Sequence, residues 1–185
     1  MLFIVSGASG AGKSTLCERL LSDFPTLTLS VSYTTRPPRG READGVHYHF
    51  VDDATFEAMV SEGAFAEWAR VHGNSYGTLR SEATERVAAG AVVLLDIDVQ
   101  GAAQVRASGV DAAYLFIEPP SFEALATRLR GRATDAADVI DRRLAIARAE
   151  IAQAHLFDHR ITNDDLDVAH RRFLDVIAIE RLARR

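Results

Sequence analysis

A glycine-rich segment near the start of the chain constrains the fold more than any other stretch. Residues 7–14 read Gly-Ala-Ser-Gly-Ala-Gly-Lys-Ser, which fits the pattern G-x-x-x-x-G-K-[ST]. The apolar run 2–5 precedes it as a buried strand would, and leucines at 16, 20 and 21 predict a helix after it. A glycine-rich turn that matches by chance would not need these flanking elements. The segment therefore predicts a phosphate-binding loop for a nucleoside triphosphate.

The parts of this loop have separate roles in binding phosphate. Glycines let the backbone curl so that successive N–H groups point toward anionic oxygens, and the helix N-terminus adds its positive end. Lys13 is expected to reach the β- and γ-phosphates, and the Ser14 hydroxyl to bind Mg²⁺. The ATP-binding residues expected in this segment are Gly7, Ala8, Ser9, Gly10, Ala11, Gly12, Lys13, Ser14 and Thr15.

Length and composition limit the class of protein. A chain of 185 residues, 48% hydrophobic and 25% charged, is typical of one globular domain that carries inserted subdomains. The net charge of −5 gives no basic field for nucleic acid or a membrane surface, so we expect neither as a partner. Cys17, the one cysteine, excludes an internal disulfide and is expected to be a small core residue. We expect no signal peptide or membrane span, and therefore a cytoplasmic location.

A polar segment at residues 33–41 carries two arginines beside a proline pair. Residues 27–32 alternate apolar and hydroxyl side chains and predict a half-buried strand before it. Pro37-Pro38 favours polyproline II, whose three residues per turn would place Arg36 and Arg39 on the same side. Such a pair can clamp one phosphate. A solvated basic loop is the alternative, and the residues alone leave both open.

Acidic residues follow a second apolar run at 91–98. A run without alternation predicts a strand covered on both faces, as in a parallel sheet. By the two-residue repeat Asp96 and Asp98 would share a face at the ligand-binding end of that sheet, and they are candidates to hold Mg²⁺. Two solvated loop acids are the alternative. Elsewhere Glu67 is flanked by apolar residues and is expected to be partly buried.

The remaining pattern alternates strands and helices. Further strands are predicted at 46–51, 65–69, 112–117 and 159–162. Further helices are predicted at 53–62, 79–89, 100–107, 121–130, 136–155 and from 165 to the end. Arginines at the start of the 136–155 helix oppose its dipole, which is understandable if they face bound phosphate.

Several segments in this order resemble guanylate kinase, a nucleoside monophosphate kinase, over nearly the whole chain. They are GASGAGKST, SVSYTTRPPR, GVHYHF, FAEWARVHGNSYGT, LLDIDVQG, RLRGR-TD and ITNDDLD. The resemblance implies a three-layer α/β P-loop kinase core with a parallel sheet at about 1–32, 83–120 and 146–185. It also implies an inserted GMP-binding subdomain at about 33–82 and a helical lid at about 121–145. The implied activity is phosphorylation of GMP and dGMP by ATP with Mg²⁺, through in-line transfer, in purine nucleotide metabolism. No protein partner is implied.

The resemblance also implies roles residue by residue. The guanine-binding positions match Ser32, Glu67 and Thr78, with Asp98 nearby. The positions that bind the GMP phosphate match Arg36, Arg39, Tyr48 and Tyr76. The acid near the metal matches Asp96, which joins Ser14 as a metal ligand. On the ATP side the matches are Arg128, Arg132, Arg143 and, near the adenine, Asn163. The implied catalytic residues are Lys13, Arg36, Arg132 and Arg143.

The chain departs from the family pattern at two positions, with Arg41 in place of a common glycine and Ala133, after Arg132, in place of the second glycine of the common G-R-G-T-D. Neither removes an expected ligand, but lid closure and GMP affinity are left open. A kinase-like interaction module without catalysis is one rival function, but such modules typically lose the phosphate-loop lysine and lid arginines. A P-loop kinase for a phosphorylated sugar is another, but it would give no role to the set Ser32, Glu67 and Thr78.

Overall fold

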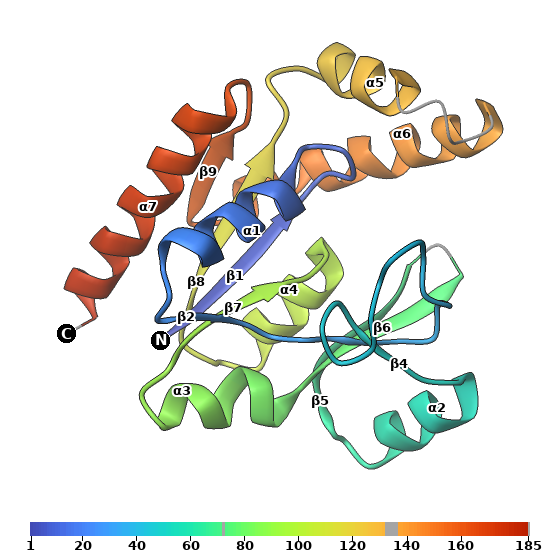
Figure 1. Ribbon diagram of the computed structural model, residues 1–185, viewed down its shortest axis with the longest axis vertical. Helices are drawn as coiled ribbons and strands as arrows, with labels where there is room; N and C mark the ends of the chain where they lie inside the picture. Colours follow the sequence, from blue (N-terminus) through green and yellow to red (C-terminus); the bar gives the residue numbers. More distant parts are fainter. Residues whose placement is uncertain (72, 132–136, 185) are drawn as a thin grey trace. The chain divides into compact units, whose positions relative to one another are not determined.

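A five-stranded sheet contains most of the buried apolar strands of the protein. The structure is a computed structural model, and it describes residues 1–71, 73–131 and 137–184. The order of the sheet is β2 (Leu27–Leu29), β7 (Val92–Asp96), β1 (Leu2–Gly7), β8 (Ala112–Glu118) and β9 (His159–Thr162). β2 pairs with β7 in parallel, and so does β8 with β9. Every residue of β1 is buried, as expected for a strand covered on both faces. The predicted α/β fold with a parallel sheet is confirmed (Figure 1).

The chain forms two compact units. The first comprises residues 1–4 and 26–112, and the second comprises residues 5–25 and 113–185. The phosphate loop lies in the second unit, whereas Ser32, Glu67 and Thr78 lie in the first. The division into a core, a GMP-binding subdomain and a lid stays a prediction.

The first unit contains a separate four-stranded sheet. Its order is β4 (His49–Phe50), β3 (Tyr33–Thr34), β6 (Asn74–Leu79) and β5 (Phe65–Val71). The helices of this unit are α2 (Asp53–Ser61), the π-helix η1 (Ser81–Glu85), α3 (Arg86–Ala88) and α4 (Val99–Ala107). Phe56 of α2 is fully buried and stacks on Phe65 of β5 with 4.7 Å between ring centroids. This contact attaches α2 to the sheet.

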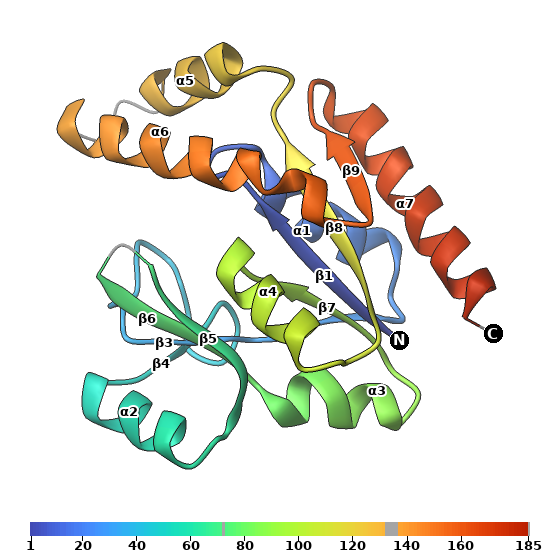
Figure 2. The same cartoon turned by 180° about the vertical axis from the view of Figure 1, so that it is seen from behind.

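The second unit is mostly helical. Its helices are α1 (Lys13–Asp23), α5 (Phe122–Gly131), α6 (Ala137–Ala152), the short 3₁₀ helix η2 (Ala154–Leu156) and α7 (Leu166–Ala183). α5 and α6 lie side by side in both ribbon views (Figure 1, Figure 2). Leu16, Cys17 and Leu20 form the buried stripe of α1. Burial raises the pKa of the Cys17 thiol to about 11, which keeps it protonated and unreactive, as a core residue should be.

The bounds of several predicted elements were wrong, and three cases have a clear structural reason. The strand predicted at 27–32 ends at Leu29, because the chain then leaves the five-stranded sheet for β3. The strand predicted at 46–51 is limited to His49–Phe50, since a turn precedes it in which Gly45, at φ 72°, donates its N–H to the Tyr48 carbonyl at 2.9 Å. The helix predicted at 79–89 begins only after β6 and starts as a π-helix.

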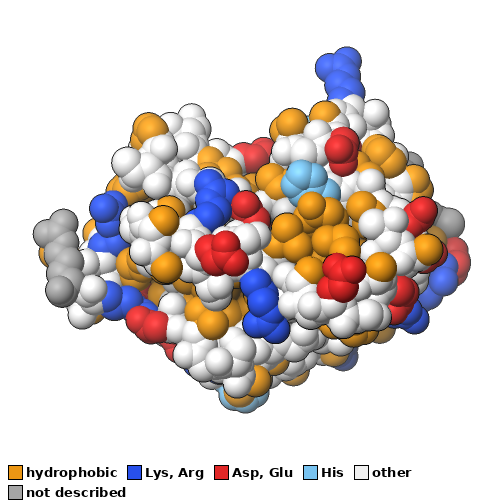
Figure 3. Space-filling model, turned by 90° about the horizontal axis from the view of Figure 1, so that it is seen from below, with side chains coloured by type: hydrophobic (Ala, Val, Ile, Leu, Met, Phe, Trp, Pro, Cys, Tyr) orange, Lys and Arg blue, Asp and Glu red, His pale blue; other side chains and the backbone are white. Residues whose placement is uncertain are grey.

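The surface view shows charges of both signs. On the face drawn in Figure 3, Lys and Arg side chains are interspersed with Asp and Glu and with hydrophobic side chains. Among the helices of the described residues, none has the length and apolar character needed to cross a bilayer. The cytoplasmic location stays a prediction.

Candidate active site

The phosphate loop depends on glycine at two positions with left-handed backbone. Gly10 has φ 93° and Gly12 has φ 89°. A Cβ at Gly12 would lie 2.3 Å from the Asn163 side-chain nitrogen, and one at Gly10 would lie 2.9 Å from a Leu129 methyl carbon. Backbone conformation and close packing therefore both require glycine there.

Asn163 holds this loop from the end of β9. Its buried side-chain amide donates to the Ala11 carbonyl at 2.8 Å, and its backbone carbonyl accepts from Arg128 Nη2 at 2.9 Å. The sequence resemblance places Asn163 near the adenine of ATP. The structure adds a contact with the loop backbone, which the sequence analysis did not foresee because the two residues are 152 positions apart.

A cavity of about 230 Å³ opens over the loop. Its lining residues are Gly7, Ala8, Ser9, Gly10, Gly12, Lys13, Ser14, Thr15 and Arg143. Arg143, on α6, donates from Nη2 to Ser9 Oγ at 2.9 Å. Two cationic side chains thus join the backbone N–H groups and the start of α1 around one pocket, which suits a polyphosphate. Eight of the nine loop residues that sequence reasoning assigned to ATP line this cavity together with Arg143, whereas Ala11, Arg128 and Asn163 do not line it.

Two charged residues of α6 differ from expectation. Arg142 is exposed and pairs with Asp138 at 2.8 Å, so it does not contact the loop as the helix-dipole argument predicted for this cluster. Glu150 was missed: its carboxylate accepts from the Ser9 N–H at 3.3 Å. Its signal was its spacing of seven residues, two helical turns, from Arg143. Arg132 lies outside the described residues.

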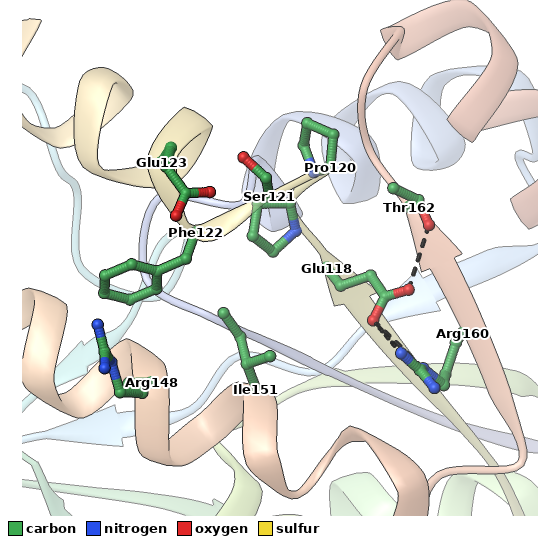
Figure 4. A pocket seen from close by; sticks show the side chains of 10 residues that line it. Glu118, Pro120, Ser121, Phe122, Glu123, Arg148, Ile151, Arg160 and Thr162 are labelled. Atoms are coloured by element: carbon green, nitrogen blue, oxygen red, sulfur yellow. Dashed lines mark hydrogen bonds and ion pairs between the residues drawn. The ribbon is translucent and has the colours of Figure 1, made fainter.

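A second cavity, of about 560 Å³, lies where β8 leads into α5 (Figure 4). Glu118 accepts from Arg160 Nη2 at 2.8 Å and from Thr162 Oγ1 at 3.1 Å. The Arg148 guanidinium lies 4.4 Å from the centroid of the Phe122 ring. Both arginines are therefore held by other residues of the cavity wall, and none of the predicted site residues that the structure describes lines this cavity.

In the first unit, the three predicted guanine-binding residues form one polar cluster. Glu67 on β5 pairs with Thr78 on β6 and is only 4% exposed. Ser32 Oγ lies 3.1 Å from Thr78 Oγ1. Burial raises the pKa of Glu67 to about 7; hydrogen bonds from Thr78 lower it, and the nearby charge of Asp98 raises it. A carboxyl and two hydroxyls thus converge in a nearly dry setting, and the burial predicted for Glu67 is confirmed.

The prediction that Asp96 and Asp98 share a strand face is wrong. β7 ends at Asp96, and Asp98 caps α4, accepting the Gly101 N–H at Oδ1 over 2.8 Å. The cap satisfies one of the N–H groups that a helix start leaves unpaired, so the two-residue repeat stops before Asp98. Asp98 nevertheless lies near Glu67, since oxygens of both approach the position of a Cβ at Gly101.

The Arg36 guanidinium forms the other half of this unit's site. Arg36 is 6% exposed and makes two hydrogen bonds with the Glu42 carboxylate, at 2.9 and 3.0 Å. It also lies 5.4 Å from the centroid of the Tyr48 ring, and Tyr48 contacts Tyr76 edge to face. Arg36 holds the pKa of Glu42 below its ordinary value. Three of the four residues predicted to bind the GMP phosphate therefore lie together, with Tyr48 and Tyr76 beside the buried Arg36 cation.

Arg39, the fourth, is exposed, and its backbone N–H donates to Glu42 at 2.7 Å. Glu42 was missed as a site residue. Its signal is its place as the first acid after the basic segment that carries Arg36 and Arg39.

Comparison with known proteins assigns the family. The guanylate kinase family model matches residues 1–180. Guanylate kinase from Syntrophotalea carbinolica is 52% identical over 180 residues, 97% of this chain and 86% of the relative. Guanylate kinase from Neisseria gonorrhoeae is 52% identical over 183 residues, 99% of this chain and 89% of the relative. The crystal structure of guanylate kinase from Anaplasma phagocytophilum superposes with a TM-score of 0.79 at 33% identity, over 97% of this chain and 85% of that one. The chain belongs to the guanylate kinase family.

Proposed function

We propose that the chain transfers the γ-phosphoryl group of ATP to GMP, and to dGMP, giving ADP and GDP or dGDP. Membership of the guanylate kinase family supports ATP as the donor and GMP as the acceptor. The observation that carries the acceptor's identity is the buried carboxyl of Glu67 beside the hydroxyls of Ser32 and Thr78. Guanine presents N1–H and the N2 amine as adjacent donors, which a carboxylate accepts as a pair, and its O6 accepts from a hydroxyl.

The proposed roles divide between the two units. In the first unit Arg36, Tyr48 and Tyr76 would bind the GMP phosphate, with Arg39 free to join from its exposed position. In the second unit the loop N–H groups, Lys13 and Arg143 would bind the ATP phosphates and stabilise charge on the γ-phosphoryl as it moves in line to a GMP oxygen. Arg132 keeps its proposed lid role as a prediction. No protein nucleophile is needed.

The residues present suit Mg²⁺ bound mainly through substrate. Within the described part of the chain, no group of three or more His, Cys, Asp or Glu side chains could hold a metal ion. Mg²⁺ in kinases takes one or two protein oxygens and completes its shell with phosphates and waters. We propose that the Ser14 hydroxyl and the Asp96 carboxylate supply those oxygens. When bound, Mg²⁺ would neutralise charge on the ATP phosphates.

An acceptor panel tests the proposed function. ADP release from Mg·ATP would be measured with GMP, dGMP, IMP, AMP, UMP and CMP as acceptors. We expect GMP and dGMP to be used and AMP to be rejected by about 10⁴-fold in kcat/KM, because AMP would leave the buried carboxyl unpaired. Activity with AMP, UMP or CMP but not with GMP would contradict the proposal.

Replacing Arg36 with lysine is expected to raise the KM for GMP about tenfold or more and to leave the KM for ATP unchanged. Lysine keeps the charge but loses the planar fork that binds two oxygens at once. Steady-state kinetics with each substrate varied in turn measures this. Arg142→Lys is the matched control, because Arg142 is exposed and forms an ion pair with Asp138 one turn away on α6. An equal rise in both KM values would place Arg36 at the donor side.

The rate with GMP should fall as the pH drops below about 7. Glu67 has a pKa of about 7 in the protein, and its protonated form would present an O–H to a guanine N–H in place of an acceptor. The pH profile of kcat/KM reports the pKa values of groups in the free enzyme and the free substrate. The phosphate of GMP is itself such a group, with a pKa of about 6. The profile of Glu67→Gln should therefore keep the phosphate step and lose the step near 7. Identical profiles would contradict this assignment.

A further inference from the structure

β5, the strand that carries Glu67, lies at the edge of the four-stranded sheet. Its one neighbouring strand in the order β4-β3-β6-β5 is β6. The pairing with β6 shifts register between Phe65 and Glu67, as at a β-bulge. Bulges interrupt the hydrogen-bond ladder and bend the strand locally. The backbone next to Glu67 is therefore supported from one side by an interrupted ladder.

The other side of β5 is held by a side chain of α4. Gln104 Nε2 donates to the Trp68 carbonyl at 2.6 Å, and Gln104 Oε1 accepts from the Trp68 N–H at 3.1 Å. One residue of a neighbouring strand makes the same two-way exchange with its partner in an antiparallel sheet. The Gln104 amide thus takes the place of a missing strand at the residue directly after Glu67.

The same helix also meets the Glu67 carboxyl. A Cβ at Gly101 would lie 2.3 Å from Glu67 Oε2 and 3.0 Å from Glu67 Cδ. Gly101 and Gln104 are three residues apart in α4 and so lie on the same side of it. The helix therefore contacts β5 twice, at the carboxyl of Glu67 and at the backbone of Trp68.

We propose that Gln104 is a positioning residue for guanine selection, because its amide fixes the backbone of β5 and so sets where the Glu67 carboxyl lies against Gly101. The proposal rests on the proposed function, in which Glu67 binds the N1–H and N2 amine of guanine. Two adjacent donors must meet two carboxylate oxygens at once. A small shift of β5 would therefore disturb both bonds to guanine, whereas a base without the N2 amine has only the bond from N1–H to lose.

The test compares GMP with IMP, which keeps N1–H and O6 but lacks the N2 amine. In Gln104→Met, which keeps side-chain length but makes neither hydrogen bond, the ratio of kcat/KM for GMP to that for IMP should fall by about threefold to tenfold. The KM for ATP should not change. Gln153→Met is the matched control, because Gln153 is a half-buried glutamine in the turn after α6 whose amide donates to the Ala149 carbonyl of that helix.

The ratio is measured on one preparation, so a lower folded fraction cancels from it. A Gln104 that merely stabilised the fold would lower both rates by the same factor, and an unchanged ratio in Gln104→Met would overturn the proposal. Gly101→Ala, which pushes on the carboxyl from the same helix, should lower the ratio as well. Glu67→Gln distinguishes the positioning role of Gln104 from the guanine-binding role of Glu67. If it changes the ratio and Gln104→Met does not, only the role of Gln104 fails; if it leaves the ratio unchanged, the proposed reading of guanine by Glu67 fails and this inference with it.

Discussion

Replacing Lys13 with alanine is expected to lower kcat by at least about a hundredfold, roughly 3 kcal/mol in the barrier, and to leave the fold intact. Lys13 lines the cavity over the phosphate loop at the first residue of α1. We assign it to the β- and γ-phosphates, where charge moves during transfer, so its loss should weaken the transition state more than ATP binding. The buried stripe of α1 is Leu16, Cys17 and Leu20, so alanine at position 13 leaves this apolar stripe intact.

Two control variants make this test specific. Lys13→Arg keeps a positive charge at the same position and should retain more activity than Lys13→Ala. Arg142→Ala removes an exposed cation from α6 and should leave kcat within about twofold. Thermal melting would confirm that each variant is folded. A folded Lys13→Ala enzyme that keeps more than a tenth of its kcat would show that the assigned role is wrong.

Lys13 also offers a chemical test, because it is the one lysine in the chain. A lysine-directed reagent can therefore modify only this side chain and the terminal amine. ATP should protect Lys13 from modification, and peptide mass analysis would separate the two products. Equal modification with and without ATP would contradict direct contact with the nucleotide.

The phosphate loop and the parallel sheet could be predicted from sequence because their signals are local. Gly10, Gly12, Lys13 and Ser14 stand at fixed spacing between a strand and a helix, and unbroken apolar runs mark strands buried on both faces. The burial of Glu67 was also local information, since its neighbours in the strand are apolar. These predictions needed no knowledge of distant contacts.

The arrangement around the site could not be predicted in the same way. Gln104 reaches Trp68 across 36 positions, and Asn163 reaches Ala11 across 152. Nothing in the spacing of such residues marks the pair. The error at Asp98 has a different origin: the strand pattern and a helix cap both fit its residue type, and the unpaired N–H groups of α4 decided between them. Glu42 was also missed: it accepts from the Arg36 guanidinium and from the Arg39 backbone N–H.

Replacing Glu67 with glutamine is expected to lower kcat/KM for GMP by about 2–4 kcal/mol, or roughly thirtyfold to a thousandfold. Glutamine has the same shape but offers one acceptor and one donor, and that donor would face a guanine N–H. The loss should be much smaller with IMP, because one of the two mismatched contacts is already absent. Kinetics with both acceptors on the same preparation measures the difference, and the KM for ATP is the internal control.

The stability of the same variant distinguishes a reading role from a supporting one. The pKa of Glu67 is higher in the folded protein, about 7, than its ordinary value, so the folded state binds the proton more tightly than the unfolded chain. The contribution of Glu67 to stability should therefore become less favourable as the pH rises from about 4.5 to about 7, and the cost of its buried charge should be fully present above that range. Glutamine carries no charge, so Glu67→Gln should melt at the same or a higher temperature than the native protein at pH 8, and this advantage should shrink at pH 5. A residue kept for guanine would show this gain in stability together with the loss of activity. A lower melting temperature at pH 8, with equal losses for GMP and IMP, would instead mean that Glu67 supports the fold.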